Sequence, residues 1–156
     1  MRLLHQKYFL LIRWMLCIFL CLPLQLLAQK RETLNLACLL NDAIEHAPEK
    51  PAINLGQAEP KIILSSASDT LVKACAEVMI STIQRDDEGK WEIVFNQKNY
   101  WFWLSGLSKV VVKKDQKVKT GETLGHLVTG KKIELLLYDF ETPLDPKKYM
   151  NCGKSQ

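Results

Sequence analysis

Histidine and cysteine are the side chains in this chain that could hold a metal ion or act as nucleophiles. Beyond the first 28 residues the sequence keeps two of its three histidines and three of its five cysteines: His46, His126, Cys38, Cys75 and Cys152. A catalytic zinc site needs three protein ligands and an activated water. The cysteines do not have the spacing of a zinc site, and they are typical of one disulfide plus a buried thiol. His126 follows a glycine turn, where a lone histidine is most often a surface residue.

Tryptophans and lysines form two further groups with possible binding roles. Trp91, Trp101 and Trp103 could stack on sugar rings, but aromatic residues that alternate along a hairpin usually pack across strands or fill a core. Five lysines surround one expected turn: Lys109, Lys113, Lys114, Lys117 and Lys119. They could meet an anionic polymer or an acidic partner, and they would equally prevent strand edges from pairing with other chains.

The N-terminal segment predicts export. Residues 1–28 run from a basic start into an apolar stretch without acidic residues, which is the layout of a secretory signal peptide cleaved after Ala28. A retained membrane anchor is the alternative, opposed by the short apolar run and by Pro23. Three of the 21 Lys and Arg lie in this segment, so 18 basic residues face 17 acidic ones in the remainder. This near-neutral balance does not favour a nucleic-acid binder.

The segment after the signal peptide predicts one helix and a linker over residues 29–58. Apolar residues recur at helical spacing between residues 33 and 46 and the pattern stops at Pro48, which predicts an amphipathic helix on the outside of the domain. His46 would lie solvated in its last turn. Residues 48–60 hold three prolines, show neither period, and are expected to form a connecting loop.

The sequence after Lys61 predicts strands. Residues 72–80 alternate between two faces, which puts Cys75 on the outer side, where it could pair with Cys38 on the covering helix. The segments WEIVF and YWFWL flank NQKN and predict a hairpin, and Asp115 and Gly121 are expected to mark two tight turns. Short strands at this density favour a mainly β sandwich or barrel over a parallel α/β sheet.

The turn-rich segment SKVVVKKDQKVKTGETLGHL resembles lysostaphin-type, or LytM-like, zinc peptidases, in which a similar segment precedes the last metal-binding strand. The ending PLDPKKYM is similar to the end of that family's domain, and DTLVKACAEV is similar to its early strand. The resemblance covers residues 59–150 and leaves 151–156 as a tail. It implies a barrel-sandwich hybrid, the duplicated-hybrid-motif barrel of that family. The helix that the apolar spacing predicts would pack on the outside of this barrel.

The resemblance also implies which positions would carry the family's chemistry. Its members hold zinc with a histidine and an aspartate on the first strand and with the second histidine of a His-x-His pair, and two further histidines assist proton transfer. The corresponding positions here are Glu59 and Ile63 on the first strand, Lys132 and Glu134 at the pair, and Gly106 at the remaining histidine. Four histidines cannot be drawn from His46 and His126. We therefore expect no catalytic residue, metal or other cofactor, and we expect Lys132 and Glu134 to pair with each other or with Glu59.

Three functions follow from these observations. The first is an exported, non-catalytic module of the cell envelope that binds peptidoglycan or an envelope protein such as a wall amidase. We expect this module to bind no nucleic acid, and to contact a membrane only through the signal segment if that segment is not cleaved. The second is a divergent peptidoglycan metalloendopeptidase whose site is rebuilt from Glu59, Glu134 and His126, although the charge of Lys132 opposes cation binding. The third is a biotinyl- or lipoyl-like adaptor modified at Lys73, which lacks the expected position at the tip of a short hairpin.

Overall fold

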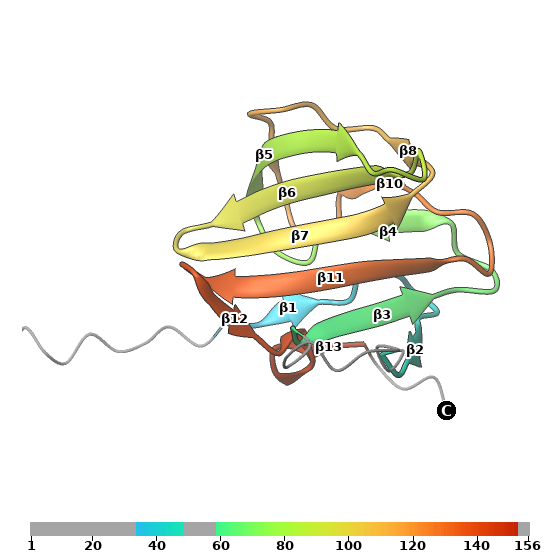
Figure 1. Ribbon diagram of the computed structural model, residues 1–156, viewed down its shortest axis with the longest axis horizontal. Helices are drawn as coiled ribbons and strands as arrows, with labels where there is room; N and C mark the ends of the chain where they lie inside the picture. Colours follow the sequence, from blue (N-terminus) through green and yellow to red (C-terminus); the bar gives the residue numbers. More distant parts are fainter. Residues whose placement is uncertain (1–33, 49–58, 153–156) are drawn as a thin grey trace, which may run out of the picture. The chain divides into compact units, whose positions relative to one another are not determined.

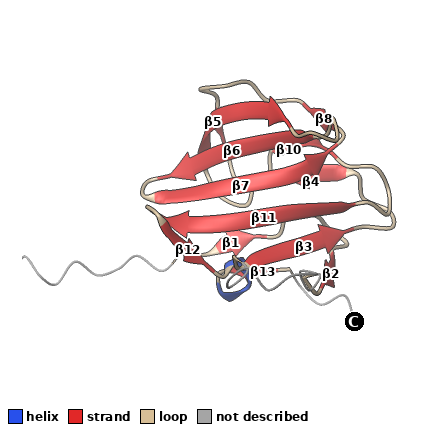
Figure 2. Ribbon diagram, in the orientation of Figure 1, coloured by secondary structure: helices blue, strands red, loops and turns tan. Residues whose placement is uncertain are grey.

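The computed structural model describes residues 34–48 and 59–152. The expected signal peptide, most of the expected linker, and residues 153–156 lie outside the described residues. The described ranges form thirteen strands and one short 3₁₀ helix, which confirms the mainly β prediction (Figures 1 and 2). Within these ranges, the structure has no helix of the length and hydropathy needed to span a membrane.

One large antiparallel sheet contains most of the strands. Its order is β2-β3-β11-β7-β6-β5-β9, and β12 also pairs with β11. The bounds are Ile44–His46 (β2), Lys61–Ser65 (β3), Val78–Arg85 (β5), Trp91–Gln97 (β6), Tyr100–Leu107 (β7), Lys117–Val118 (β9), Lys132–Asp139 (β11) and Thr142–Leu144 (β12).

Two smaller sheets complete the domain. The first has the order β4-β10-β8, and the second pairs β1 with β13 in parallel. The bounds are Leu36–Ala37 (β1), Leu71–Lys73 (β4), Lys109–Val110 (β8), Thr123–His126 (β10) and Met150–Asn151 (β13). The 3₁₀ helix η1 (Pro146–Lys148) precedes β13, and the Asp145 side chain caps it by accepting a hydrogen bond from the Lys147 amide.

The hydrophobic core joins the inner face of the large sheet to the two smaller sheets. Alternate residues of β6, β7 and β11 point inward, as period-2 patterning requires. Phe95 and Phe102 stack there with ring centroids 5.1 Å apart. Val72 of β4 and Leu124 of β10 belong to the same buried cluster. The opposite face of the large sheet is therefore the one free to present functional side chains.

The expected hairpin and turns are present. The two-residue connection between β6 and β7 falls where the sequence predicts a hairpin. Asp115 and Gly121 both have positive φ, 62° and 83° respectively, as tight turns require. The amides of Gln116 and Glu122 close these turns through hydrogen bonds to the carbonyls of Lys113 and Lys119.

The helix predicted over residues 33–46 is wrong. The described part of that range contains β1, a turn and β2, with no helical residue. Leu36, Leu39 and Leu40 are buried, so the apolar spacing does mark core residues. Their burial comes from packing against the sheets, and the amide of Leu36 bonds to the carbonyl of Tyr149 instead of to a helical neighbour. Tertiary contacts have overridden the local helical pattern.

The predicted disulfide between Cys38 and Cys75 is also wrong, because Cys38 pairs with Cys152. Residues 72–80 do not form one strand: β4 ends at Lys73, β5 begins at Val78, and a turn lies between them. That turn directs Cys75 into the core, where it is a buried free thiol. Burial raises the pKa of Cys75 to about 12, so the thiol is protonated and inert at neutral pH.

The side chain of Asp69 connects two loops. Its carboxylate accepts hydrogen bonds from the amides of Asn41 (3.0 Å) and Leu71 (2.9 Å). Burial opposes the ionisation of Asp69, but these two amides and the charge of Lys73 outweigh it and lower the pKa below 3.8. The ionised carboxylate therefore stabilises the fold.

Replacing Asp69 with alanine is expected to lower the free energy of unfolding by about 1–2 kcal/mol at pH 7, the scale of hydrogen bonds to a charged group. Because the folded-state pKa is lowered, this stabilisation is present above the unfolded value and disappears as the pH falls through the folded value. Denaturant unfolding of both proteins across this range measures the difference. Asp87→Ala, in an exposed turn, is the control, and a difference that stays constant down to low pH would contradict the role of the carboxylate.

Candidate functional site

The outer face of the large sheet brings several candidate positions into one row. The register pairs Ile63 of β3 with Glu134 of β11, and Glu134 with Ser105 of β7. Paired residues of antiparallel strands point to the same face. On the other side of β3, His46 of β2 pairs with Ile63. The row therefore runs from His46 through Ile63 and Glu134 to Ser105.

Glu134 forms an ion pair that the sequence did not predict. Its carboxylate lies 2.6 Å from the ammonium of Lys61, which projects from the same face of β3 two register pairs away. Both side chains are about one third exposed, at 37% for Glu134 and 31% for Lys61. A pair at this exposure contributes about 1 kcal/mol or less to stability. Its larger effect is to place the ammonium group of Lys61 against the carboxylate of Glu134.

Glu59 lies away from Glu134. Its carboxylate accepts a hydrogen bond of 2.9 Å from the hydroxyl of Tyr138. Tyr138 is four residues from Glu134 along β11, a distance of about 13 Å. Burial, and then the hydrogen bond and charge of Glu59, raise the pKa of Tyr138 to about 12. We expected Lys132 and Glu134 to pair with each other or with Glu59; instead, Glu134 is bonded to Lys61 and Glu59 to Tyr138.

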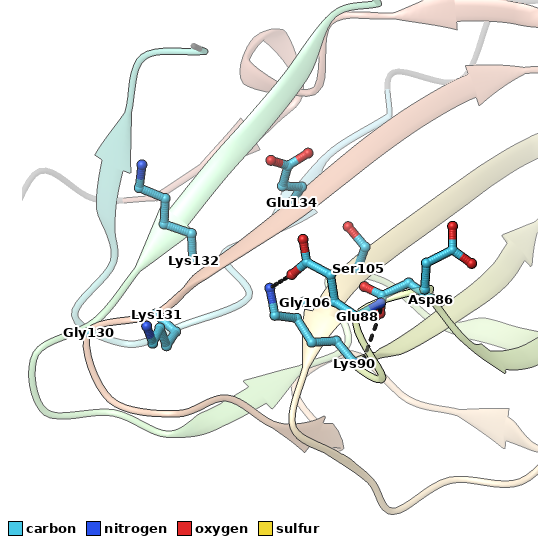
Figure 3. A pocket seen from close by; sticks show the side chains of 10 residues that line it. Asp86, Glu88, Lys90, Ser105, Gly106, Gly130, Lys131, Lys132 and Glu134 are labelled. Atoms are coloured by element: carbon cyan, nitrogen blue, oxygen red, sulfur yellow. Dashed lines mark hydrogen bonds and ion pairs between the residues drawn. The ribbon is translucent and has the colours of Figure 1, made fainter.

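Three of the five expected positions line one pocket of about 680 Å³: Gly106, Lys132 and Glu134. The opposite wall is the β5–β6 turn, which contributes Asp86, Asp87, Glu88 and Lys90. Figure 3 shows Lys132 and Glu134 projecting from one side of the pocket, and Glu88 and Lys90 joined to each other on the other side. The remaining two positions do not contribute to it, since Ile63 is 3% exposed and Glu59 is bonded elsewhere.

The turn that forms the opposite wall is held by its own polar groups. The carboxylate of Asp86 accepts hydrogen bonds from the amides of Glu88 (2.9 Å) and Lys90 (2.8 Å). The ammonium of Lys90 forms an ion pair with Glu88 at 2.5 Å, and this contact raises the pKa of Lys90. The pocket therefore presents charges of both signs, several already paired within it.

Gly106 occupies a β-bulge at the edge of this pocket. Between the register pairs Trp91–Leu107 and Ile93–Leu104, β7 has two residues where β6 has one. Gly106 takes φ +90°, and a Cβ atom there would lie 2.6 Å from the carbonyl oxygen of Lys132. Only glycine fits this position without a shift of the backbone.

The two described histidines lie on different sheets. His46 is on β2, not at a helix end, and its Nε2 is 2.8 Å from the hydroxyl of Ser65. His126 is the last residue of β10 in the small sheet, not in the turn where it was expected. In the part of the chain that the structure describes, no three His, Cys, Asp or Glu side chains come together in an arrangement that could hold a metal.

Sequence reasoning missed His46, Lys61 and Tyr138 as residues of this sheet face. For His46, the sequence carried no strand signal, because β2 has only three residues and their burial does not alternate, while the apolar spacing of the preceding leucines favoured a helix. Lys61 and Tyr138 were within segments correctly predicted as strands. Their partners could not be predicted, because both contacts join residues more than 70 positions apart, at separations of 73 and 79.

Comparison with solved structures identifies the fold. Lysostaphin, an antimicrobial peptidase from Staphylococcus simulans, is similar with a TM-score of 0.61 and 21% identity, over 80% of this chain and 57% of that one. Csd3 from Helicobacter pylori has a TM-score of 0.61 and 15% identity, over 79% and 35%. The SpoIIQ–SpoIIIAH pore-forming complex matches with a TM-score of 0.55 and 14% identity, over 80% and 96%. The chain thus spans little more than half of lysostaphin and about a third of Csd3. No family model and no curated protein matches.

Proposed function

We propose that this chain, which has the LytM-like fold, is an exported, non-catalytic module that binds peptidoglycan or a protein that acts on it. The proposal takes the pocket lined by Gly106, Lys132 and Glu134 as the remnant of a metal site. The observation that carries it is the ion pair between Lys61 and Glu134 on the face where the resemblance places zinc ligands.

The charges around Glu134 support a site without metal. A catalytic zinc ion needs three protein ligands. Here the carboxylate of Glu134 is bonded to an ammonium group, and Lys132 adds a second cation on the same strand. The positive charges of Lys61 and Lys132 oppose the binding of a metal cation beside Glu134. Gly106, where the resemblance places a histidine that assists proton transfer, cannot be exchanged for histidine without a backbone shift.

The disulfide supports export. Disulfides persist in secreted and periplasmic proteins and are rare in reducing compartments. The pairing of Cys38 with Cys152 is therefore in keeping with the signal peptide proposed for residues 1–28. Cleavage of that segment and the envelope location are parts of the same proposal.

The pocket supports a binding role. Its volume of about 680 Å³ lies within the range of ligand sites, about 300–1,000 Å³. Asp87 and Glu88 on one wall and Lys131 and Lys132 on the other offer charges of both signs. A peptide stem of peptidoglycan carries carboxylates and amines, and a loop of a partner protein can do the same. Either would match a mixed-charge pocket.

The experiment combines three measurements on one preparation of the mature protein. Metal analysis is expected to find no stoichiometric zinc, murein is expected to release no soluble peptide, and the protein is expected to sediment with purified peptidoglycan or bind a purified wall amidase. Lysostaphin serves as the positive control for peptide release. If the protein binds neither peptidoglycan nor the amidase, the proposed binding module is wrong. Glu134→Ala and Lys132→Ala are the pocket variants, and Asp115→Asn is the control away from the pocket.

A rebuilt metalloendopeptidase is the second candidate, and one observation favours it. His46 lies in the same register row as Ile63 and Glu134, so an imidazole does reach this sheet face. One zinc ion per chain, lost on His46→Ala and on Glu134→Ala, together with chelator-sensitive peptide release, would establish this enzyme in place of the module. The adaptor alternative has no such support, because Lys73 lies within a sheet and donates to the side chain of Asn41 at 2.7 Å.

A further inference from the structure

Trp101 and Trp103 lie side by side on the outer face of β7, with 40% and 39% of their surfaces exposed. They are two residues apart on one strand, so they point to the same side. Ser105, the next residue on that face, lines the pocket. The two indoles therefore form a row that leads along β7 to the pocket; we call this pair the tryptophan platform. The large sheet that carries it is seen in Figure 1.

The platform is not explained by core packing. Trp91 differs: at the start of β6 it packs against the core, and the guanidinium of Arg85 lies 4.4 Å from its ring. Trp101 and Trp103 are absent from that core, whose aromatic centre is Phe95 and Phe102. Large apolar side chains that remain exposed as neighbours commonly mark a binding surface.

The residues beside the platform are uncharged. Trp103 is paired with Val94 on β6 and Leu136 on β11, and Trp101 is paired with Asn96 and Tyr138. Asn96 and Tyr138 carry hydrogen-bonding groups at the edge of the platform, bonded to Ser81 and Glu59 respectively. The nearest charged groups, Glu59 and Lys61, lie one residue further out and are each bonded to a neighbour, so the platform itself suits a ligand with apolar faces and neutral polar edges.

The size of the platform points to a small ligand unit. A tryptophan presents about 250 Å² in all, so two at about 40% exposure offer roughly 200 Å². A stable protein–protein interface uses about 800 Å² per partner. The platform is thus about a quarter of one side of such an interface, and its area matches the faces of a few sugar rings.

We propose that Trp101 and Trp103 bind a neutral glycan by stacking on the apolar faces of its sugar rings, while Asn96 and Tyr138 meet its hydroxyl or amide groups. The glycan would extend along β7 towards the pocket. The identity of the sugar rests on the proposed function: for a module that binds peptidoglycan, it is the N-acetylhexosamine backbone of the wall.

The test titrates the mature protein with the hexamer of N-acetylglucosamine and measures binding by tryptophan fluorescence and calorimetry. Trp101→Ala and Trp103→Ala are each expected to weaken binding by about tenfold or more, the scale of one lost aromatic contact. The double variant is expected to lose binding, and Trp103→Phe to retain part of it. Val111→Ala, an exposed apolar residue away from this face, is the control. Thermal unfolding confirms that each variant is folded.

The outcomes separate this inference from the proposed function. Failure of the wild type to bind the hexamer, or equal binding by the double variant, would overturn the platform even if the protein still sediments with peptidoglycan. Hexamer binding lost in the double variant would establish the platform, even if peptidoglycan and the amidase are not retained. If the double variant loses the amidase and keeps the hexamer, the surface docks a protein and the glycan proposal is wrong.

Discussion

Replacing Cys38 and Cys152 together by serine is expected to lower the free energy of unfolding by about 4–5 kcal/mol. The two cysteines are 114 positions apart, and a crosslink over a loop of this length removes that much chain entropy from the unfolded state. The midpoint of thermal unfolding should fall by roughly 10–20 °C. Because β1 and β13 are only two residues each and pair next to the disulfide, they are expected to separate first.

Calorimetry with and without a reductant tests this expectation. The wild type unfolded and refolded in reductant should match the double serine variant, which itself should not respond to the reductant. Cys75→Ala is the matched control, because this thiol is buried and free. It should lose only the stability of a small cavity, about 1 kcal/mol, and should keep the response to reductant. A response lost in Cys75→Ala would mean that Cys75 takes part in the disulfide.

The disulfide also shows where sequence reasoning fails. The pairing of β1 with β13 and of Cys38 with Cys152 joins the two ends of the described chain, and no local pattern records a contact at that separation. The even-numbered residues from 72 to 80 are buried, as the alternation predicted. However, the chain turns at residues 74–77, and this turn places Cys75 in the core as well. A period of two cannot distinguish one strand from two short strands separated by a buried turn.

Where the pattern is long, the prediction holds. β6 and β7 alternate over seven and eight residues, and their hairpin and the fold built on it follow from that alternation. The turns at Asp115 and Gly121 were predicted because turn residues interrupt a run of valines. The 33–46 segment had only a short pattern, and there the apolar spacing identified the buried residues but not their conformation.

In the candidate site, too, some features could be predicted from the sequence and others could not. Gly106, Lys132 and Glu134 line one pocket, because the pairing of β7 with β11 brings them together. The bonding partners of the site are set by side chains that reach across strands. Lys61 holds Glu134 and Tyr138 holds Glu59, and these contacts depend on register and side-chain direction together. Sequence spacing alone determines neither the strand register nor the direction of these side chains.

Replacing Gly106 with alanine is expected to lower the free energy of unfolding by about 3 kcal/mol. The residue has φ +90°, which costs a side chain about 1–2 kcal/mol. Its new Cβ would also lie 2.6 Å from the carbonyl oxygen of Lys132, and relief of that overlap adds about 1–3 kcal/mol. Gly106→His, which restores the residue that the resemblance implies, should be destabilised at least as much.

Gly89→Ala separates the two causes. Gly89 has a similar φ of +78°, but its added Cβ would meet nothing within 4 Å. This variant should therefore lose only the conformational part, about 1–2 kcal/mol. Denaturant unfolding of the three variants measures the differences at pH 7. If Gly106→Ala lost no more stability than Gly89→Ala, β7 could move away from β11, and the position would be open to an imidazole. If the extra loss is observed, the β-bulge makes a histidine at position 106 costly, and the proton-transfer group that the resemblance implies cannot be restored there without a shift of the backbone.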